Sequence, residues 1–253
     1  MFNIGDYVTR NSYNNDIVFK IIDIRGEVYY LKGVSVRLYA DSYQDDLVKC
    51  DDEMDKDTFR PSIDEYRNLN RNEYFYLPGR ILHIDGDKEY LEKCMAFYKK
   101  NKIKAYGLYM RENDMASQVQ GLLKKYNPDI LVLTGHDSFS RSKRQKYKNT
   151  TNFVSAVTEA RNYEKSHEKL FVIAGACQSN YEDLIKAGAN FASSPKRINI
   201  HALDPAIVAS SLALSDKNNN IDLIHILEKT KYGADGMGGI ITKGTMYVGY
   251  PRE

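Results

Sequence analysis

The chain has 253 residues, of which 42% are hydrophobic, enough apolar material for the core of one or two domains. Its 36 basic and 34 acidic side chains nearly cancel, which argues against a nucleic-acid partner and against attachment to a membrane surface. Three widely spaced cysteines argue against a disulfide scaffold or a zinc site and favour a reducing compartment, and the sequence shows neither a membrane span nor a secretory signal.

Residues 1–50 carry the pattern of a small β domain. Strand-like runs rich in β-branched and aromatic residues occupy 18–24, 28–31 and 34–38, and residues 25–27 form a turn between the first two. Short strands at this spacing predict an SH3-like barrel. Residues 51–73 are highly charged and contain Pro61, so we interpret them as a linker that leads into an α/β catalytic domain over residues 74–253.

Strand-like and helix-like segments alternate from residue 76 onward. The predicted strands are 80–84, 103–109, 129–134 and 170–174, and the predicted helices are 87–101, 114–126, 152–163 and 179–187. Short extended pieces at 190–192 and 198–200, two further helices and a terminal hairpin of 240–241 with 246–248 complete the chain. This alternation predicts a three-layer α/β fold around a mostly parallel sheet, and the chain after the linker is too short for an eight-unit βα barrel.

Two of these predicted strands end in a turn of small residues that presents one reactive side chain. Residues 129–137 (Asp-Ile-Leu-Val-Leu-Thr-Gly-His-Asp) present His136, and residues 170–179 (Leu-Phe-Val-Ile-Ala-Gly-Ala-Cys-Gln-Ser) present Cys177. Residues beyond the carboxyl ends of parallel strands face the crevice in which α/β enzymes bind their ligands. We therefore predict a Cys177 nucleophile with His136 as its general base, a pair that needs no metal and no organic cofactor.

The residues that flank this pair are expected to shape the turns and the oxyanion hole. They are Gly135, Asp137, Gly175 and Ala176. Small residues allow a tight turn and a close approach of substrate, and backbone N–H groups at such turns stabilise a developing oxyanion. A helix that begins soon after Cys177 would favour its thiolate form.

His201 is the competing partner for Cys177. It follows Cys177 along the chain and lies close to Asp204, and a cysteine at a strand-to-helix turn with a later histidine is the order used by glutamine-amidotransferase-like folds. We interpret Cys94 and His83 as structural residues. A third hypothesis is a non-catalytic docking protein built on the N-terminal β domain.

The strand ending in His and the later strand ending in Ala-Cys resemble the caspase, legumain, clostripain and gingipain group of cysteine peptidases, although that group has Gly directly after the His, where this chain has Asp137. Four longer segments resemble the YabG family of sporulation proteases: 2–8, 131–137, 174–179 and 187–205, the last reading Ala-Gly-Ala-Asn-Phe-Ala-Ser-Ser-Pro-Lys-Arg-Ile-Asn-Ile-His-Ala-Leu-Asp-Pro.

The resemblance implies a cysteine endopeptidase with a caspase-like fold that processes spore-coat and other spore proteins. It also implies a location in the mother-cell cytoplasm with association to the coat, and no nucleic-acid or membrane partner.

The loop after the first strand of the caspase-like sheet often reads the P1 side chain of the substrate. Here that loop is Asp85-Gly86-Asp87, so the resemblance implies cleavage after Arg or Lys, because Arg pairs bidentately with a carboxylate. Asp85 is the better candidate, since Asp87 is also expected to cap a helix. Such a preference predicts self-cleavage in the basic loop 141–148 or at the linker residues Arg60, Arg67 and Arg71.

Overall fold

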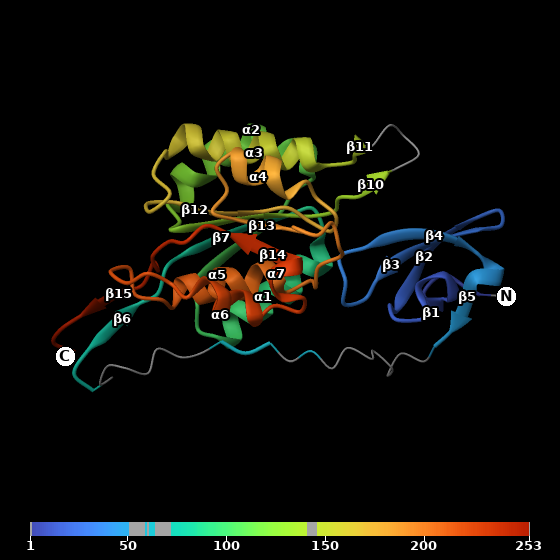
Figure 1. The fold of residues 1–253 in the computed structure, drawn as a ribbon, viewed down its shortest axis with the longest axis horizontal. Helices are drawn as coiled ribbons and strands as arrows, with labels where there is room; N and C mark the ends of the chain where they lie inside the picture. The colour runs from blue at the N-terminus through green and yellow to red at the C-terminus, as the bar shows by residue number, and fades with distance from the viewer. Residues whose placement is uncertain (1, 51–58, 60, 64–71, 141–145, 253) are drawn as a thin grey trace. The chain divides into compact units, whose positions relative to one another are not determined.

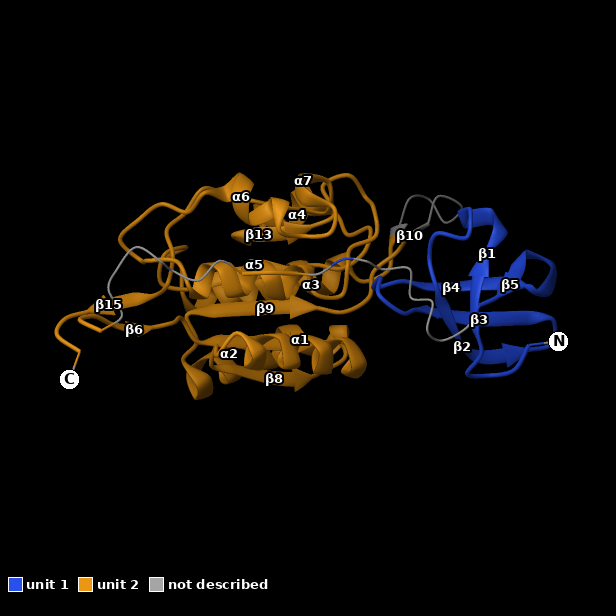
Figure 2. Cartoon of the chain, turned by 90° about the horizontal axis from the view of Figure 1, so that it is seen from below, with its two compact units in different colours: residues 1–60 blue, residues 61–253 orange. Residues whose placement is uncertain are grey.

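The computed structural model describes residues 2–50, 59, 61–63, 72–140 and 146–252 (Figure 1). The chain divides into two compact units, Met1–Arg60 and Pro61–Glu253, which Figure 2 colours separately. Most of the predicted linker falls on residues outside those described, so the proposed domain limits of 1–50, 51–73 and 74–253 stay a prediction.

The first unit is a five-stranded antiparallel sheet in the order β4-β3-β2-β1-β5. Its elements are β1 (Tyr7–Arg10), η1 (Asn11–Tyr13), β2 (Phe19–Arg25), β3 (Val28–Gly33), β4 (Tyr39–Tyr43), η2 (Gln44–Asp46) and β5 (Leu47–Lys49). The predicted strand 34–38 is instead the turn into β4, because the N–H of Gly33 donates across it to the carbonyl of Leu38. The strand order leaves β4 and β5 as the two edges of this sheet, so an SH3-like closed barrel is not confirmed.

The second unit is built on a six-stranded sheet in the order β14-β13-β12-β9-β7-β8. Its strands are β7 (Ile81–Asp85), β8 (Ala105–Tyr109), β9 (Ile130–Thr134), β12 (Phe171–Ala174), β13 (Phe191–Ser193) and β14 (Met237–Gly239). Only β14 runs antiparallel to its neighbour. Every residue of β7, β9, β12 and β13 is buried, which explains why these strands are nearly continuous apolar runs in the sequence.

Helices cover both faces of this sheet (Figure 1). One face carries α2 (Glu112–Tyr126), α3 (Thr150–Tyr163) and α4 (Tyr181–Lys186), and the other carries α1 (Lys88–Lys100), α5 (Asp204–Ala213), α6 (Leu223–Glu228) and α7 (Gly233–Gly236). All residues of α5 are buried, as expected of a helix that is apolar on every side. The α/β prediction is therefore confirmed, while the caspase-like assignment stays a proposal.

The predicted terminal hairpin is wrong. β15 (Tyr247–Gly249) pairs with the distant β6 (Phe75–Leu77), and β14 joins the edge of the main sheet. Gly238 and Gly239 permit that junction, because an added Cβ would lie 2.9 Å from the Tyr181 ring or 2.5 Å from the Phe191 ring. A further short pair, β10 (Phe139–Ser140) with β11 (Lys146–Tyr147), flanks residues 141–145, which lie outside those described.

The strand order reverses direction between β7 and β9, because β8 lies on one side of β7 and all later strands lie on the other. In open α/β sheets, ligands bind beyond the carboxyl ends of the strands at such a reversal. In the part of the chain that the structure describes, no helix is long and apolar enough to cross a membrane.

Candidate active site

The register of β7 against β9 places Asp87 opposite His136. Asp85 and Thr134 are paired residues at the ends of these parallel strands. Asp87 and His136 each lie two residues further along, in the loops at the strand reversal. Neighbouring strands are about 4.8 Å apart, so the sheet delivers these two side chains to adjacent positions.

The register of β9 against β12 does the same for His136 and Cys177. Leu133 pairs with Ala174, and His136 and Cys177 each lie three residues beyond that pair. Three adjacent parallel strands therefore supply a carboxylate, an imidazole and a thiol at one edge of the sheet. The sequence analysis predicted the strand ends, and the structure adds that the strands are neighbours.

The His136 ring is held between a carboxylate and an aromatic ring. Its Nε2 lies 3.0 Å from Oδ2 of Asp87, and its centroid lies 5.7 Å from that of Tyr90. The side chain keeps 13% of its surface exposed. A carboxylate only accepts hydrogen bonds, so Nε2 carries the proton and Nδ1 is the basic nitrogen of the neutral ring. An imidazole oriented in this way is the arrangement used by general bases of acyl-transfer enzymes.

The carboxylates of Asp87 and Asp85 form hydrogen bonds inside the site. One oxygen of Asp87 caps α1 by accepting the N–H groups of Glu89 and Tyr90, and the other contacts His136. Asp85 is fully buried, and its two oxygens accept the N–H of Asp87 and the hydroxyl of Thr134. The P1-reading role expected of Asp85 and Asp87 stays a prediction, and in this structure both carboxylates are engaged by groups inside the site.

Cys177 is fully buried, and residues 197–201, which we name the covering segment, contact its thiol and its turn. Its Sγ accepts the N–H of Ile200 at 3.2 Å, and the N–H of Gln178 donates to the carbonyl of Ile198 at 3.1 Å. Gln178 and Arg197 both adopt left-handed backbone conformations, each with φ of +57°. Non-glycine residues in this conformation are strained by about 1–3 kcal/mol and concentrate at functional sites.

Arg197 ties the covering segment to two other elements. Its Nε donates to the Tyr147 hydroxyl of β11 at 2.9 Å, and its guanidinium forms an ion pair with Glu182 of α4. That guanidinium holds the pKa of the Glu182 carboxyl below its ordinary value, chiefly through the hydrogen bond.

The turn that precedes Cys177 is shaped by Gly175 and Ala176. Gly175 has φ of +110°, and its N–H donates to the carbonyl of Leu133 at 3.0 Å. The N–H of Ala176 donates to Oγ of Ser179 at 3.0 Å. Gly175 and Ala176 therefore shape the turn, and as oxyanion donors they would have to give up these bonds.

Gly135 and Asp137 enclose His136 from the other strand. A Cβ on Gly135 would lie 2.4 Å from Oε1 of Glu112, and the same Glu112 oxygen accepts the N–H of His136 at 2.8 Å. The buried carboxylate of Asp137 accepts the N–H of Asn149 and the hydroxyls of Thr150 and Ser179, among others. Asp137 thereby joins the histidine turn, the start of α3 and the cysteine turn.

His201 lies next to the residue that contacts the thiol. Its N–H donates to Asp204, and its ring Nδ1 accepts the N–H of Leu203 at 3.1 Å. The ring nitrogen that would take a proton from Cys177 is thus already engaged by the backbone. Cys94 is buried on α1 with its thiol against the carbonyl of Ala202, as a structural cysteine would be.

Glu112, Ser179 and Thr134 are site residues that the sequence analysis missed. Each acts through a backbone N–H or another polar side chain, and contacts of this kind depend on strand register. The one signal in the sequence was equal spacing. Asp87 follows Asp85 by two residues, as His136 follows Thr134, and Asp85 and Thr134 are paired in the sheet.

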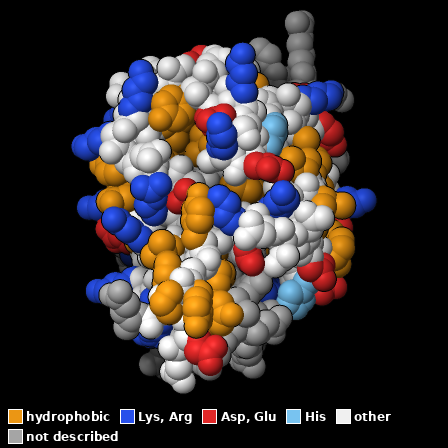
Figure 3. All heavy atoms as spheres, turned by 90° about the vertical axis from the view of Figure 1, so that its left-hand side faces the viewer, with side chains coloured by type: hydrophobic (Ala, Val, Ile, Leu, Met, Phe, Trp, Pro, Cys, Tyr) orange, Lys and Arg blue, Asp and Glu red, His pale blue; other side chains and the backbone are white. Residues whose placement is uncertain are grey.

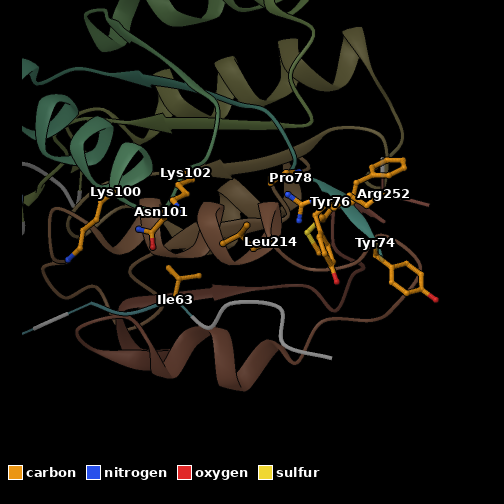
Figure 4. Close-up of a pocket in the computed structure, with 11 residues that line it drawn as sticks. Ile63, Tyr74, Tyr76, Pro78, Lys100, Asn101, Lys102, Leu214 and Arg252 are labelled. Carbon is orange, nitrogen blue, oxygen red and sulfur yellow. The ribbon is translucent and has the colours of Figure 1, made fainter. Parts of the chain in front are cut away.

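A separate cavity of about 360 Å³ lies at the opposite, amino edge of the sheet (Figure 4). Aromatic, aliphatic and basic residues line it, among them Tyr74, Tyr76, Lys100, Lys102 and Arg252, and no Cys, His, Asp or Glu is among its lining residues. Figure 3 looks onto this end of the molecule, where apolar side chains are interspersed with Lys and Arg. In the described residues no group of three or more His, Cys, Asp and Glu side chains is arranged to hold a metal ion.

Comparisons with known proteins show the family of the chain. The model of the YabG peptidase U57 family matches residues 3–68 and 55–251. The sporulation-specific protease YabG of Bacillus subtilis (strain 168) is 39% identical over 286 aligned positions, covering 100% of this chain and 99% of that protein. A crystal structure of a GDP-L-fucose synthetase from Naegleria fowleri covers 50% of this chain and 40% of its own, at 14% identity and a TM-score of 0.23, too low to carry an argument.

Proposed function

The chain belongs to the YabG peptidase U57 family of sporulation proteases, and from this premise we propose that it is a cysteine endopeptidase with a Cys177 nucleophile. His136 is the general base and Asp87 its orienting carboxylate. The observation that supports the proposal is the register of β7, β9 and β12, because the residues that follow three adjacent parallel strands lie at one edge of the sheet.

The proposed reaction follows from the hydrogen bonds around His136. Nδ1 takes the thiol proton as Sγ of Cys177 attacks the scissile carbonyl, and the imidazolium is stabilised by Asp87 through Nε2–H. The same nitrogen returns the proton to the leaving amine, which leaves a thioester. Water then attacks the thioester with His136 as base, releasing the acid product and the free thiol. The N–H groups of Gly135 and Asp137 are the proposed oxyanion donors.

Spore-coat and other spore proteins remain the proposed substrates, with processing in the mother-cell cytoplasm and association with the coat. The name of the relative, a sporulation-specific protease, supports this class of substrate. Cleavage after Arg or Lys also remains part of the proposal. With Asp85 and Asp87 engaged inside the site, the partly exposed carboxylate of Glu112, beside His136, is the proposed acidic group at the crevice.

The predicted self-cleavage sites lie largely outside the described residues, since 141–145, Arg60, Arg67 and Arg71 are not among them. N-terminal sequencing of purified wild type and Cys177→Ala tests the prediction. New termini after basic residues in the wild type alone support self-cleavage, and identical uncut chains in both would contradict it.

A panel of fluorogenic peptides that differ only at P1 tests the function. We expect wild type to cleave the Arg and Lys members, Cys177→Ala and His136→Ala to lose activity by about 10³-fold or more, and His201→Ala to keep it. Equal kcat/KM across the panel would contradict the proposed preference for Arg or Lys at P1, but it would still support peptidase activity.

The second candidate is a hydrolase that uses Cys177 with His201. It is favoured by one contact, the N–H of Ile200 on the Cys177 sulfur, which places the His201 backbone next to the thiol. Activity lost with His201→Ala and kept with His136→Ala would establish it. Wild type that cleaves no peptide or amide would favour the docking protein instead.

A further inference from the structure

A chain of buried hydrogen bonds runs from α1 to the carboxylate behind the candidate site. Nδ1 of His83 lies 2.9 Å from the Tyr98 hydroxyl, and Nε2 of His83 lies 2.8 Å from Oγ1 of Thr134. Thr134 donates to Oδ2 of Asp85 at 2.9 Å. All four side chains have no exposed surface. We name Tyr98, His83, Thr134 and Asp85 the buried chain.

The direction of each hydrogen bond in the buried chain follows from the Asp85 carboxylate at its end. The carboxylate of Asp85 only accepts, so the single hydroxyl proton of Thr134 is committed to it. The neutral His83 ring then carries its proton on Nε2, which lies 2.8 Å from Oγ1 of Thr134 and 3.5 Å from Oδ2 of Asp85, and its Nδ1 accepts from Tyr98. Every bond therefore directs its proton toward Asp85. Linked bonds of this kind polarise one another and rigidify the groups at their end.

The end of the buried chain is the backbone of Asp87. The second oxygen of Asp85 accepts the Asp87 N–H at 2.9 Å, while the Asp87 side chain contacts His136. The loop that carries Asp87 is thus anchored on one side by Asp85 and on the other by the first turn of α1.

We infer that the buried chain is a positioning device for the Asp87–His136 pair, with Thr134 as its essential link. The inference rests on the proposed function and deepens it. A purely structural polar cluster has no reason to end on the residue that orients a catalytic base, and apolar side chains would fill this core without the cost of desolvation. Because Asp85 is held rigidly, it fixes the backbone of Asp87 so that Oδ2 of Asp87 stays within hydrogen-bond distance of Nε2 of His136.

Thr134→Val tests the inference, because valine keeps the shape of threonine and removes both hydrogen bonds of the hydroxyl. We expect kcat for the best peptide to fall by roughly 10- to 100-fold with KM within about 2-fold, since displacement of a catalytic group on the ångström scale costs about that much. Thr134→Ser restores the hydroxyl and should recover kcat to within about 3-fold.

The matched control is Thr245→Val, which removes a buried hydroxyl bonded to the Leu212 carbonyl at the opposite edge of the sheet. It should lower stability as Thr134→Val does and leave kcat unchanged. If Thr134→Val does not fold, Tyr98→Phe removes the hydroxyl at the far end of the buried chain, and we expect a kcat loss of roughly 3- to 10-fold.

A readout that does not depend on activity is the ¹⁵N spectrum of the His136 ring. Wild type should show the Nε2–H tautomer, and Thr134→Val should show a mixture of tautomers. Wild-type kcat and an unchanged ring spectrum in Thr134→Val, with Cys177→Ala and His136→Ala inactive, would overturn the inference and leave the proposed function intact. Full activity of Cys177→Ala would instead contradict the proposed function. The ring spectrum of Thr134→Val would still show whether the buried chain positions the His136 ring.

Discussion

Asp87 makes two kinds of contact, with the start of α1 and with His136, and substitution can separate their effects. One carboxylate oxygen caps α1 and the other lies 3.0 Å from Nε2 of His136. Asn caps helices as well as Asp does, so Asp87→Asn should keep the cap of α1 and lower the free energy of unfolding by no more than about 3 kcal/mol, the contribution of the contact with His136. The amide, however, replaces a charged acceptor of the Nε2 proton. Loss of a charge-assisted hydrogen bond of about 1.5–3 kcal/mol corresponds to roughly 10- to 150-fold in rate.

A second effect adds to this loss, because an amide nitrogen facing Nε2 favours the ring tautomer with the proton on Nδ1, the nitrogen that must act as base. We therefore expect kcat/KM of Asp87→Asn to fall on the order of 10³-fold. The assay is peptide hydrolysis beside urea unfolding of the same samples. Asp87→Ser is the control, since serine also caps but cannot reach the ring, and it should lose activity to a similar extent. Asp87→Asn with kcat/KM within about 3-fold of wild type would refute the orienting role.

Three further predictions follow from the packing of the site. Gly135→Ala should lower kcat by roughly 10- to 100-fold, because its Cβ would lie 2.4 Å from Oε1 of Glu112 and displace the acceptor of the histidine N–H; unchanged kinetics would contradict this. Asp137→Ala should lower the free energy of unfolding by about 3 kcal/mol or more in urea titration, because buried donors lose their acceptor; a loss under about 1 kcal/mol would count against it. Arg197→Ala should speed alkylation of Cys177 by iodoacetamide by about 10-fold, because the covering segment loses its ties to β11 and α4; an unchanged rate would mean that these ties do not hold the segment closed.

The strands that carry the site could be predicted from sequence because they are buried on both faces. Residues 130–134 and 171–174 form continuous apolar runs between turn residues, and such runs mark parallel strands covered by helices. The positions of His136 and Cys177 beyond those strands followed directly. The N-cap role of Asp87 was also predictable, because the cap depends on local hydrogen bonds.

Long-range pairing could not be predicted in the same way. The sequence offered Asp85 and Asp87 as residues of a P1-reading loop, with Asp87 also expected to cap a helix. Only the structure shows that Asp87 contacts His136 and that Asp85 is buried. The terminal hairpin failed for a related reason. A pairing between residues 75–77 and 247–249 joins opposite ends of the unit, and no local turn signals it.

The covering segment is the other feature that sequence patterns left out. Residues 198–200 have an extended pattern, and they were predicted as an ordinary extended piece. In the structure the carbonyl of Ile198 accepts the N–H of Gln178, and the N–H of Ile200 donates to the thiol of Cys177. Contacts of this kind depend on how the chain returns over the sheet after β13, which no spacing of residues reveals.

The measurement that tests the central claim most directly is the site of covalent labelling by a peptide chloromethyl ketone. The reagent alkylates an activated thiol within a peptide-binding site much faster than an ordinary exposed thiol. Peptide mapping by mass spectrometry should place the label on Cys177 in wild type, with labelling slowed by roughly 10²-fold or more in His136→Ala and unchanged in His201→Ala. Label on Cys50 or Cys94, or labelling of Cys177 at the wild-type rate in His136→Ala, would contradict the Cys177–His136–Asp87 account.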